Sequence, residues 1–332
     1  MAQKQTRVEF LNTVRGFTQA RIIHVATKYD LFDTIPEGGL NSKELSKLLD
    51  FKPGPSETLC NALVSLGLLK KHKTFFSLTS FSKEYLVSTS KNYLGFLIKH
   101  LSDMMEGYIH LDETLKTGKP LKTLTSITKN KDYAKDFTLT MHTISSYLSP
   151  QFSKLLDLST SQNLIDIGGG PGTYSIQLCK DNPKLHATIL DLPSVLSVTK
   201  KIIRQYQLTD RIQCLPLDYS KDPIPHDYDV ALLSNIIHIE GPEANNNLIQ
   251  KVYNALSHRG MIIIQDYVLN DDLTEPLDGA LFAISMLLYT DKGRCYSFKE
   301  IQNWLHSAGF KKITEIKPRA PRRASLIYAH KF

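Results

Sequence analysis

The sequence predicts an α/β protein in which a doubly wound, mostly parallel sheet follows a mainly helical region. A chain of 332 residues is long for one compact domain, which favours two. From residue 163 onward, short apolar runs alternate with helical patterns, as in parallel sheets. Residues 163–173 read Asn-Leu-Ile-Asp-Ile-Gly-Gly-Gly-Pro-Gly-Thr, a buried strand running into a glycine turn. A helical pattern follows, and strand, glycine turn and helix together are typical of the first unit of a nucleotide-binding sheet.

Composition excludes several classes of protein. The 42% hydrophobic and 22% charged residues are ordinary for a globular protein. No apolar run approaches the roughly 20 residues that span a membrane, and the N-terminus lacks the apolar stretch of a secretory signal. The four cysteines, Cys60, Cys179, Cys214 and Cys295, are too far apart for paired zinc ligands. We therefore expect reduced thiols, no metal site, no membrane association and a cytoplasmic location.

The first hundred residues predict a small winged-helix shape. Apolar side chains recur at helical spacing over residues 7–31. Asn41 or Ser42 is a candidate N-cap for a second helix, and a turn over residues 52–55 leads to a third. Residues 68–79 then predict two short strands around a basic tip.

Two functions are open for this region. It carries 14 Lys and Arg against 8 Asp and Glu, and Lys70, Lys71 and Lys73 at the tip would suit DNA. The helix over residues 7–31, however, has more apolar side chains than a small domain can bury alone. We favour dimerisation and keep DNA binding as the alternative.

Further helices are expected over residues 92–158, interrupted by a loop at residues 117–121. They are rich in methionine and aromatic residues, which are more often core than ligand wall. Phe137, Met141 and His142 directly precede the sheet and are candidates for covering its ligand. The predicted organisation is a winged-helix-like dimerisation domain at 1–100, a helical linker or ligand-site region at 101–158 and a nucleotide-binding domain at 159–332.

The remaining elements follow in alternation. The expected strands lie at 163–168, 186–191, 211–216, 228–234, 260–267, 312–317 and 324–330. The expected helices between them include 194–206, 243–256 and 297–308, the last of which ends at Gly309.

The glycine spacing and later acids narrow the choice of nucleotide. A dinucleotide fingerprint would need a glycine at residue 173, which is Thr; Gly168 and Gly170 fit, but the third glycine is Gly172. Asp191 ends the second strand, where a carboxylate can accept from both ribose hydroxyls. Asp218 and Tyr219 follow the third strand, where they could bind the amino group and the face of adenine. A helix cap is the ordinary alternative for any one of these acids.

The stretches 166–172, 191–193, 218–219 and 234–238 together closely resemble S-adenosylmethionine-dependent methyltransferases. The pattern is most similar to the dimeric small-molecule O-methyltransferases that include caffeic acid and acetylserotonin methyltransferases, and it covers nearly the whole chain. The resemblance implies a class I methyltransferase sheet, a homodimer, and S-adenosylmethionine contacts at Gly168, Gly170, Asp191, Asp218, Tyr219 and Ser234.

The resemblance also implies a general base at His238, four residues past the fourth strand. A neutral imidazole is the natural base near pH 7. Asp266, at the end of the fifth strand, matches one of the two acids that flank this histidine in the family, but the position of the second acid falls on Cys295. Many members have His-Asp-Trp where this chain has His238-Ile239-Glu240, so it stays open whether Glu240 or Cys295 replaces the second acid.

The expected function is therefore methyl transfer from S-adenosylmethionine to a hydroxyl of a small aromatic molecule. His238 would be the base, Asp266 its orienting acid, and Phe137, Met141, His142 and Met286 part of the acceptor site. The alternatives are methylation of nitrogen, sulfur or carbon, a relative that binds S-adenosylmethionine without methylating, and a DNA-binding regulator that senses this molecule.

Overall fold

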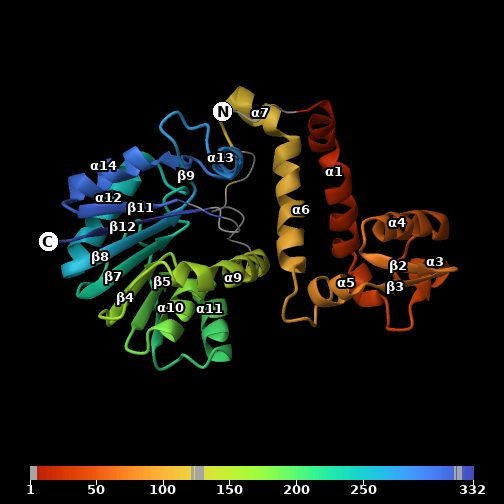
Figure 1. The fold of residues 1–332 in the computed structure, drawn as a ribbon, viewed down its shortest axis with the longest axis horizontal. Helices are drawn as coiled ribbons and strands as arrows, with labels where there is room; N and C mark the ends of the chain where they lie inside the picture. Colours follow the sequence, from red (N-terminus) through yellow and green to blue (C-terminus); the bar gives the residue numbers. More distant parts are fainter. Residues whose placement is uncertain (1–5, 121–122, 124–130, 318, 320–323) are drawn as a thin grey trace. The chain divides into compact units, whose positions relative to one another are not determined.

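The computed structural model describes residues 6–120, 123, 131–317, 319 and 324–332, and for residues 131 and 132 it describes the backbone alone. The chain forms two compact units, Met1–Glu106 and Gly107–Phe332 (Figure 1). The division into three domains expected from the sequence remains a prediction. Within the described ranges, no helix is long and apolar enough to cross a membrane.

The first unit begins with α1 (Arg7–Lys28), which Thr6 and Glu9 cap reciprocally. The helix stops three residues before the expected end because Asp30 adopts a left-handed conformation, with φ at 51°. Its apolar side chains include several that are exposed within the unit: Val8, Phe10, Leu11, Val14 and Phe17, with Phe17 at 63% exposure. Such a stripe is typical of a protein–protein interface.

The expected helix, turn, helix and two strands follow α1. The elements are α2 (Leu31–Thr34), β1 (Leu40–Asn41), α3 (Ser42–Leu48), α4 (Pro53–Ser65), β2 (Leu69–His72), β3 (Phe75–Leu78) and α5 (Ser80–Tyr85). The strands form a small antiparallel sheet in the order β1-β3-β2. Lys71 on β2 binds Glu57 at 3.1 Å and Asn61 at 2.8 Å, so it is already engaged within the unit.

The second unit contains the predicted doubly wound sheet, which is confirmed. Its strands are β4 (Asn163–Ile167), β5 (His186–Asp191), β6 (Ile212–Pro216), β7 (Tyr228–Ser234), β8 (Leu256–Asp266), β11 (Lys311–Ile316) and β12 (Ser325–His330). They lie in the order β11-β12-β8-β7-β4-β5-β6. The strands β4 to β8 are parallel, whereas β12 pairs antiparallel with both β8 and β11.

Helices cover both faces of this sheet (Figure 1). On one face pack α9 (Lys131–Ser153), α10 (Thr173–Asp181) and α11 (Pro193–Gln205); on the other pack α12 (Pro242–Ala255) and α14 (Phe298–Ala308). Each face has its own apolar core, and the strands are buried between the two. The helices α6 (Gly95–Ile109) and α7 (Leu111–Thr117) precede α9 in the chain, with α6 crossing the boundary between the units.

Some elements differ from the sequence prediction. Strand β8 starts at Leu256, four residues earlier than expected. Helix α13 (Leu277–Tyr289) was not predicted, and neither was the two-stranded pair of β9 (Val268–Leu269) and β10 (Tyr296–Ser297). Both additions come after β8 in the chain, and Phe282 of α13 packs against His238.

The topology brings the candidate residues to one edge of the sheet. Because β4 to β8 are parallel, their carboxyl ends all lie at the same edge. Gly168, Asp191, Asp218, Ser234 and Asp266 each end or follow one of these five strands. Ligands of doubly wound sheets bind at this edge.

Candidate functional site

The glycine turn after β4 is tied to the end of β5. The Gly170 amide donates to Oδ2 of Asp191 at 2.8 Å, and the Leu192 amide donates to Oδ1 at 2.7 Å. Burial raises the pKa of the Asp191 carboxyl, while these two amides oppose that rise. Each carboxylate oxygen has accepted one amide and can accept a further hydrogen bond, so Asp191 fits the two hydroxyls of a ribose.

Glycine is needed at residue 168 for two reasons. Its φ is +63°, and a Cβ there would lie 2.4 Å from Cδ1 of Ile236. Gly170 also has a positive φ, of +53°, but a Cβ at that residue would meet no atom within 4 Å. An alanine at either residue would be strained by the positive φ, but only an alanine at 168 would also overlap another side chain.

We expect Gly168→Ala to destabilise the protein more than Gly170→Ala, by about 1–3 kcal/mol in the free energy of unfolding. Both variants carry the left-handed backbone strain of about 1–2 kcal/mol, whereas only alanine at 168 must displace Ile236. Denaturant unfolding of the ligand-free proteins measures the difference. Equal losses in the two variants would show that Ile236 moves aside without cost.

Asp166 lies beneath this turn and is a second buried acid. The side chain is 2% exposed, and Oδ2 accepts from the Ser175 hydroxyl at 2.6 Å. Oδ1 is buried without a hydrogen-bond partner among the described residues. Burial, reinforced by the nearby Asp191, raises the pKa of the Asp166 carboxyl to about 7.

This raised pKa predicts a pH-dependent loss of stability. The native state holds the Asp166 proton up to about pH 7, whereas the unfolded chain releases it near pH 3.8, so stability falls as the pH rises between these values. Relative to Asp166→Asn, the unfolding free energy should fall by at most about 1.4 kcal/mol per pH unit and level off above about pH 7. Denaturant titrations of both proteins from about pH 5 to 8 test this. A difference that does not change with pH would contradict it.

The turn after β6 carries Asp218 and Tyr219. Oδ1 of Asp218 accepts from the amide and hydroxyl of Ser220, and Oδ2 contacts Lys221 at 2.9 Å. These partners lower the pKa of the Asp218 carboxyl. Nζ of Lys251 on α12 donates to the backbone oxygens of this turn, at 3.0 Å for Tyr219. Lys251 thus fixes the backbone of the turn, and the Asp218 carboxylate is bound by Ser220 and Lys221 of the same turn.

Ser234 ends β7 within a row of hydrogen bonds. Its hydroxyl accepts from Nδ2 of Asn235 at 3.2 Å and from Nε2 of Gln265 at 3.4 Å. The Gln265 amide also donates to the Tyr174 hydroxyl at 2.7 Å. This row links the ends of β7 and β8 to α10. Gln265 was not predicted from the sequence. Its place directly before Asp266 at the end of a strand was the one feature that could have indicated a role in the site.

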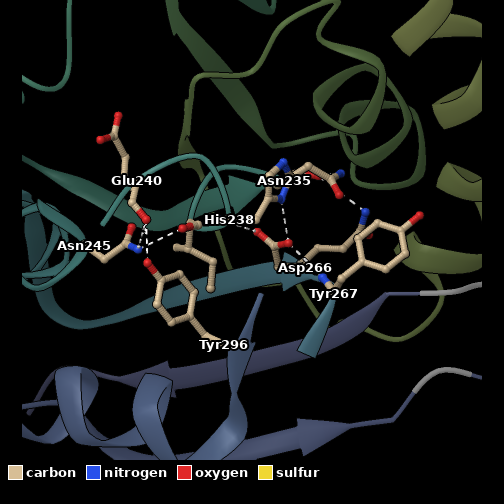
Figure 2. Close-up of polar contacts among 10 residues, drawn as sticks. Asn235, His238, Glu240, Asn245, Asp266, Tyr267 and Tyr296 are labelled. Atoms are coloured by element: carbon tan, nitrogen blue, oxygen red, sulfur yellow. Dashed lines mark hydrogen bonds and ion pairs between the residues drawn. The ribbon is translucent and has the colours of Figure 1, made fainter. Parts of the chain in front are cut away.

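His238 and Asp266 form a buried pair (Figure 2). Nδ1 of His238 lies 2.7 Å from Oδ1 of Asp266, and the two side chains are 8% and 1% exposed. The His238 amide also donates to Oδ2 of Asp266 at 3.3 Å, and the Tyr267 amide donates to Oδ1 at 2.7 Å. A carboxylate accepts, so Nδ1 carries the proton, which leaves the lone pair on Nε2. This arrangement can act as a general base.

One aromatic side chain packs against this base, and a second packs on the first. The ring of Phe282 on α13 meets the His238 imidazole edge to face, with centroids 4.9 Å apart. The other neighbour of Phe282 is the Tyr267 ring, which stacks on it at 4.2 Å. Neither residue was singled out from the sequence. The apolar pattern of residues 277–289 was the available signal.

Cys295 and Glu240 were the two candidates for a second acid at His238. Cys295 is buried, and burial raises the pKa of its thiol to about 12, so it is neutral near pH 7. Figure 2 shows the Glu240 carboxylate pointing away from the imidazole and from Asp266. Asp266 is the carboxylate that the structure places on His238.

The four predicted acceptor-site residues lie on two helices. Phe137, Met141 and His142 belong to α9, and Met286 to α13. Nδ1 of His142 lies 2.8 Å from the Thr173 hydroxyl at the start of α10, so His142 sits beside the glycine turn, and burial lowers its pKa. Met286 is buried, one turn after Phe282. The acceptor role of all four remains a prediction.

Comparison with known protein families identifies both parts of the chain. Residues 110–311 match an O-methyltransferase domain, and residues 11–88 match an O-methyltransferase dimerisation domain. The second match agrees with the exposed apolar stripe of α1 and gives no support to the DNA-binding alternative.

Individual relatives cover most of the chain. A 3-hydroxy-5-methyl-1-naphthoate 3-O-methyltransferase from Streptomyces sahachiroi is 28% identical over 92% of this chain and 90% of its own. An L-tyrosine C(3)-methyltransferase from Streptomyces lavendulae is 27% identical over 89% and 84%. The structure of human N-acetylserotonin methyltransferase in complex with S-adenosylmethionine matches with a TM-score of 0.86 and 21% identity, covering 100% of this chain and 99% of that one. This last likeness concerns the fold.

Proposed function

The chain belongs to the O-methyltransferase family that carries a dimerisation domain, and on that basis we propose that it methylates a hydroxyl of a small aromatic molecule with His238 as general base. It is an enzyme, and S-adenosylmethionine is its methyl donor. The hydrogen-bonded pair of His238 and Asp266 is the observation that carries the choice of base. The exposed stripe on α1 supports a homodimer.

The residues at the edge of the sheet fit S-adenosylmethionine. Asp191 would hold the ribose hydroxyls, because both of its oxygens are oriented by backbone amides. A Cβ at Gly170 would meet no protein atom within 4 Å, so the space beside this glycine is free for the ligand. Tyr219 and Asp218 would contact the adenine end, and Ser234 would border the site from β7. When bound, S-adenosylmethionine supplies a methyl group on positively charged sulfur, which is already activated toward a nucleophile.

His238 has two tasks in this proposal. Nε2 takes the proton of the acceptor hydroxyl, so that the oxygen reacts as a phenolate; a free phenol has a pKa of about 10 and is protonated near pH 7. Asp266 holds the ring in one tautomer and stabilises the imidazolium that forms. The rest of the rate gain comes from holding the oxygen in line with the methyl group.

The surroundings of His238 favour a flat acceptor. The Phe282 ring meets the imidazole edge to face, and the Tyr267 ring stacks on Phe282. Aromatic ligands pack well on such rings, by offset stacking or edge to face. This contact is the structural reason to propose an aromatic acceptor over an aliphatic one.

The experiment is a screen of phenols, catechols, aromatic amines and activated aromatic carbons with S-adenosylmethionine that carries a deuterated methyl group. We expect S-adenosylhomocysteine release with a phenol or catechol, and product fragmentation that places the label on oxygen. Label on nitrogen, sulfur or carbon would contradict the proposed acceptor atom. That outcome is a real alternative, because one relative is named as a C-methyltransferase.

A further inference from the structure

The side chain of Glu240 is directed toward Tyr219. Oε1 of Glu240 accepts from the Tyr219 hydroxyl at 3.4 Å. Figure 2 shows the carboxylate on the opposite side of its own backbone from Asp266. Glu240 is two residues from His238 in sequence, yet its carboxylate contacts Tyr219, in the turn after β6.

Two side chains hold the backbone of Glu240 in place. Its carbonyl accepts from the Tyr296 hydroxyl and from Nδ2 of Asn245, the latter at 3.3 Å (Figure 2). The Asn245 amide also donates to the carbonyl of Ile237 at 2.8 Å, so the turn is held on both sides of residue 239. These bonds fix the backbone from which the Glu240 side chain reaches Tyr219.

Tyr219 is the residue that receives this contact. Its ring lies 3.5 Å from where a Cβ of Gly168 would stand, so it borders the glycine turn. Lys251 holds its backbone oxygen. Burial, and then the charge of Glu240, raise the pKa of the Tyr219 phenol, so the hydroxyl stays protonated and can donate.

We propose that Glu240 is a positioning residue for the nucleoside end of the site: through its contact with the Tyr219 hydroxyl it orients the Tyr219 ring against the adenine, and it takes no part in proton transfer at His238. This inference rests on the proposed function, since it requires that S-adenosylmethionine binds at the glycine turn. Many members of the resembled family have tryptophan at the position of Glu240.

The test measures the Kd of S-adenosylhomocysteine and of 5′-methylthioadenosine, which keeps the nucleoside and lacks the amino acid. We expect Glu240→Ala to weaken both ligands about three- to tenfold, because a single hydrogen bond of this kind contributes modestly. Glu240→Gln should stay within about twofold of the native protein, since its amide oxygen still accepts. The pH dependence of kcat should be unchanged in Glu240→Ala.

A double-mutant cycle decides whether Tyr219 transmits the effect. Tyr219→Phe removes only the hydroxyl, and adding Glu240→Ala to it should cause no further loss of affinity. A further loss of the same size, an unchanged Kd in Glu240→Ala alone, or a displaced pH profile of kcat would each overturn the inference. If the native protein fails to bind S-adenosylhomocysteine at all, the proposed function itself is wrong, so the two failures are distinguishable.

Discussion

Replacement of His238 by alanine is expected to lower kcat for a phenolic acceptor by about 10²–10⁴-fold, the usual contribution of a positioned general base. The imidazole is buried, Asp266 orients it at 2.7 Å, and the Phe282 ring packs against it. Alanine removes the nitrogen that would accept the proton. Single-turnover formation of methylated product measures the effect.

The matched control is His226→Ala. His226 is an exposed histidine of the same unit, whose Nδ1 lies 3.1 Å from the carbonyl of Asn254. Its removal should leave kcat unchanged. The Kd of S-adenosylhomocysteine should be close to native in both variants. Undiminished methylation by His238→Ala would show that the acceptor loses its proton elsewhere.

Replacement of Asp191 by alanine is expected to weaken S-adenosylmethionine binding by about 100-fold or more. Two hydrogen bonds from ribose hydroxyls to a charged group contribute about 1.5–3 kcal/mol each, and about 1.4 kcal/mol corresponds to a factor of ten. The variant also frees the amides of Gly170 and Leu192, so the glycine turn loses its anchor. Calorimetric Kd values measure the loss.

The KM for S-adenosylmethionine should rise in Asp191→Ala, while kcat at saturation falls much less, because the carboxylate contributes binding in both the ground and transition states. Asp191→Asn keeps one acceptor oxygen, so its KM for S-adenosylmethionine should lie between those of the native protein and Asp191→Ala. Denaturant unfolding shows whether the variant is folded. A folded Asp191→Ala protein that binds within twofold of native would contradict the assignment of the ribose site.

Much of the fold was predictable because it depends on local patterns. The alternation of apolar strands and amphipathic helices after residue 163 indicates a parallel sheet, and the structure confirms it. Helix α13 escaped prediction because residues 277–289 are apolar on nearly every side, which hides the helical period. The early start of β8 escaped prediction because the strand is irregular there: Arg259 has a positive φ of 65°, and the pairing with β7 shifts register between Leu256 and Met261.

The candidate site was predictable where it follows strand ends. The sequence places Asp191 and Asp266 at the ends of β5 and β8, and parallel pairing brings them to one edge. The direction of a side chain was beyond reach. Glu240 contacts Tyr219, which lies 21 residues earlier, and Tyr296, 56 residues later, binds its backbone. Phe282 reaches His238 from a helix that the sequence did not reveal.

In the proposed reaction His238 removes a proton from the acceptor oxygen. The most direct test of this step compares two phenols of similar shape at one pH, one with a pKa near 10 and one acidic enough to be ionised already. We expect His238→Ala to lose about 10²–10⁴-fold in methylation of the first phenol and to retain most of the rate with the second, which needs no base. Equal losses with both phenols would contradict proton removal by His238 and leave it a residue that only positions the acceptor.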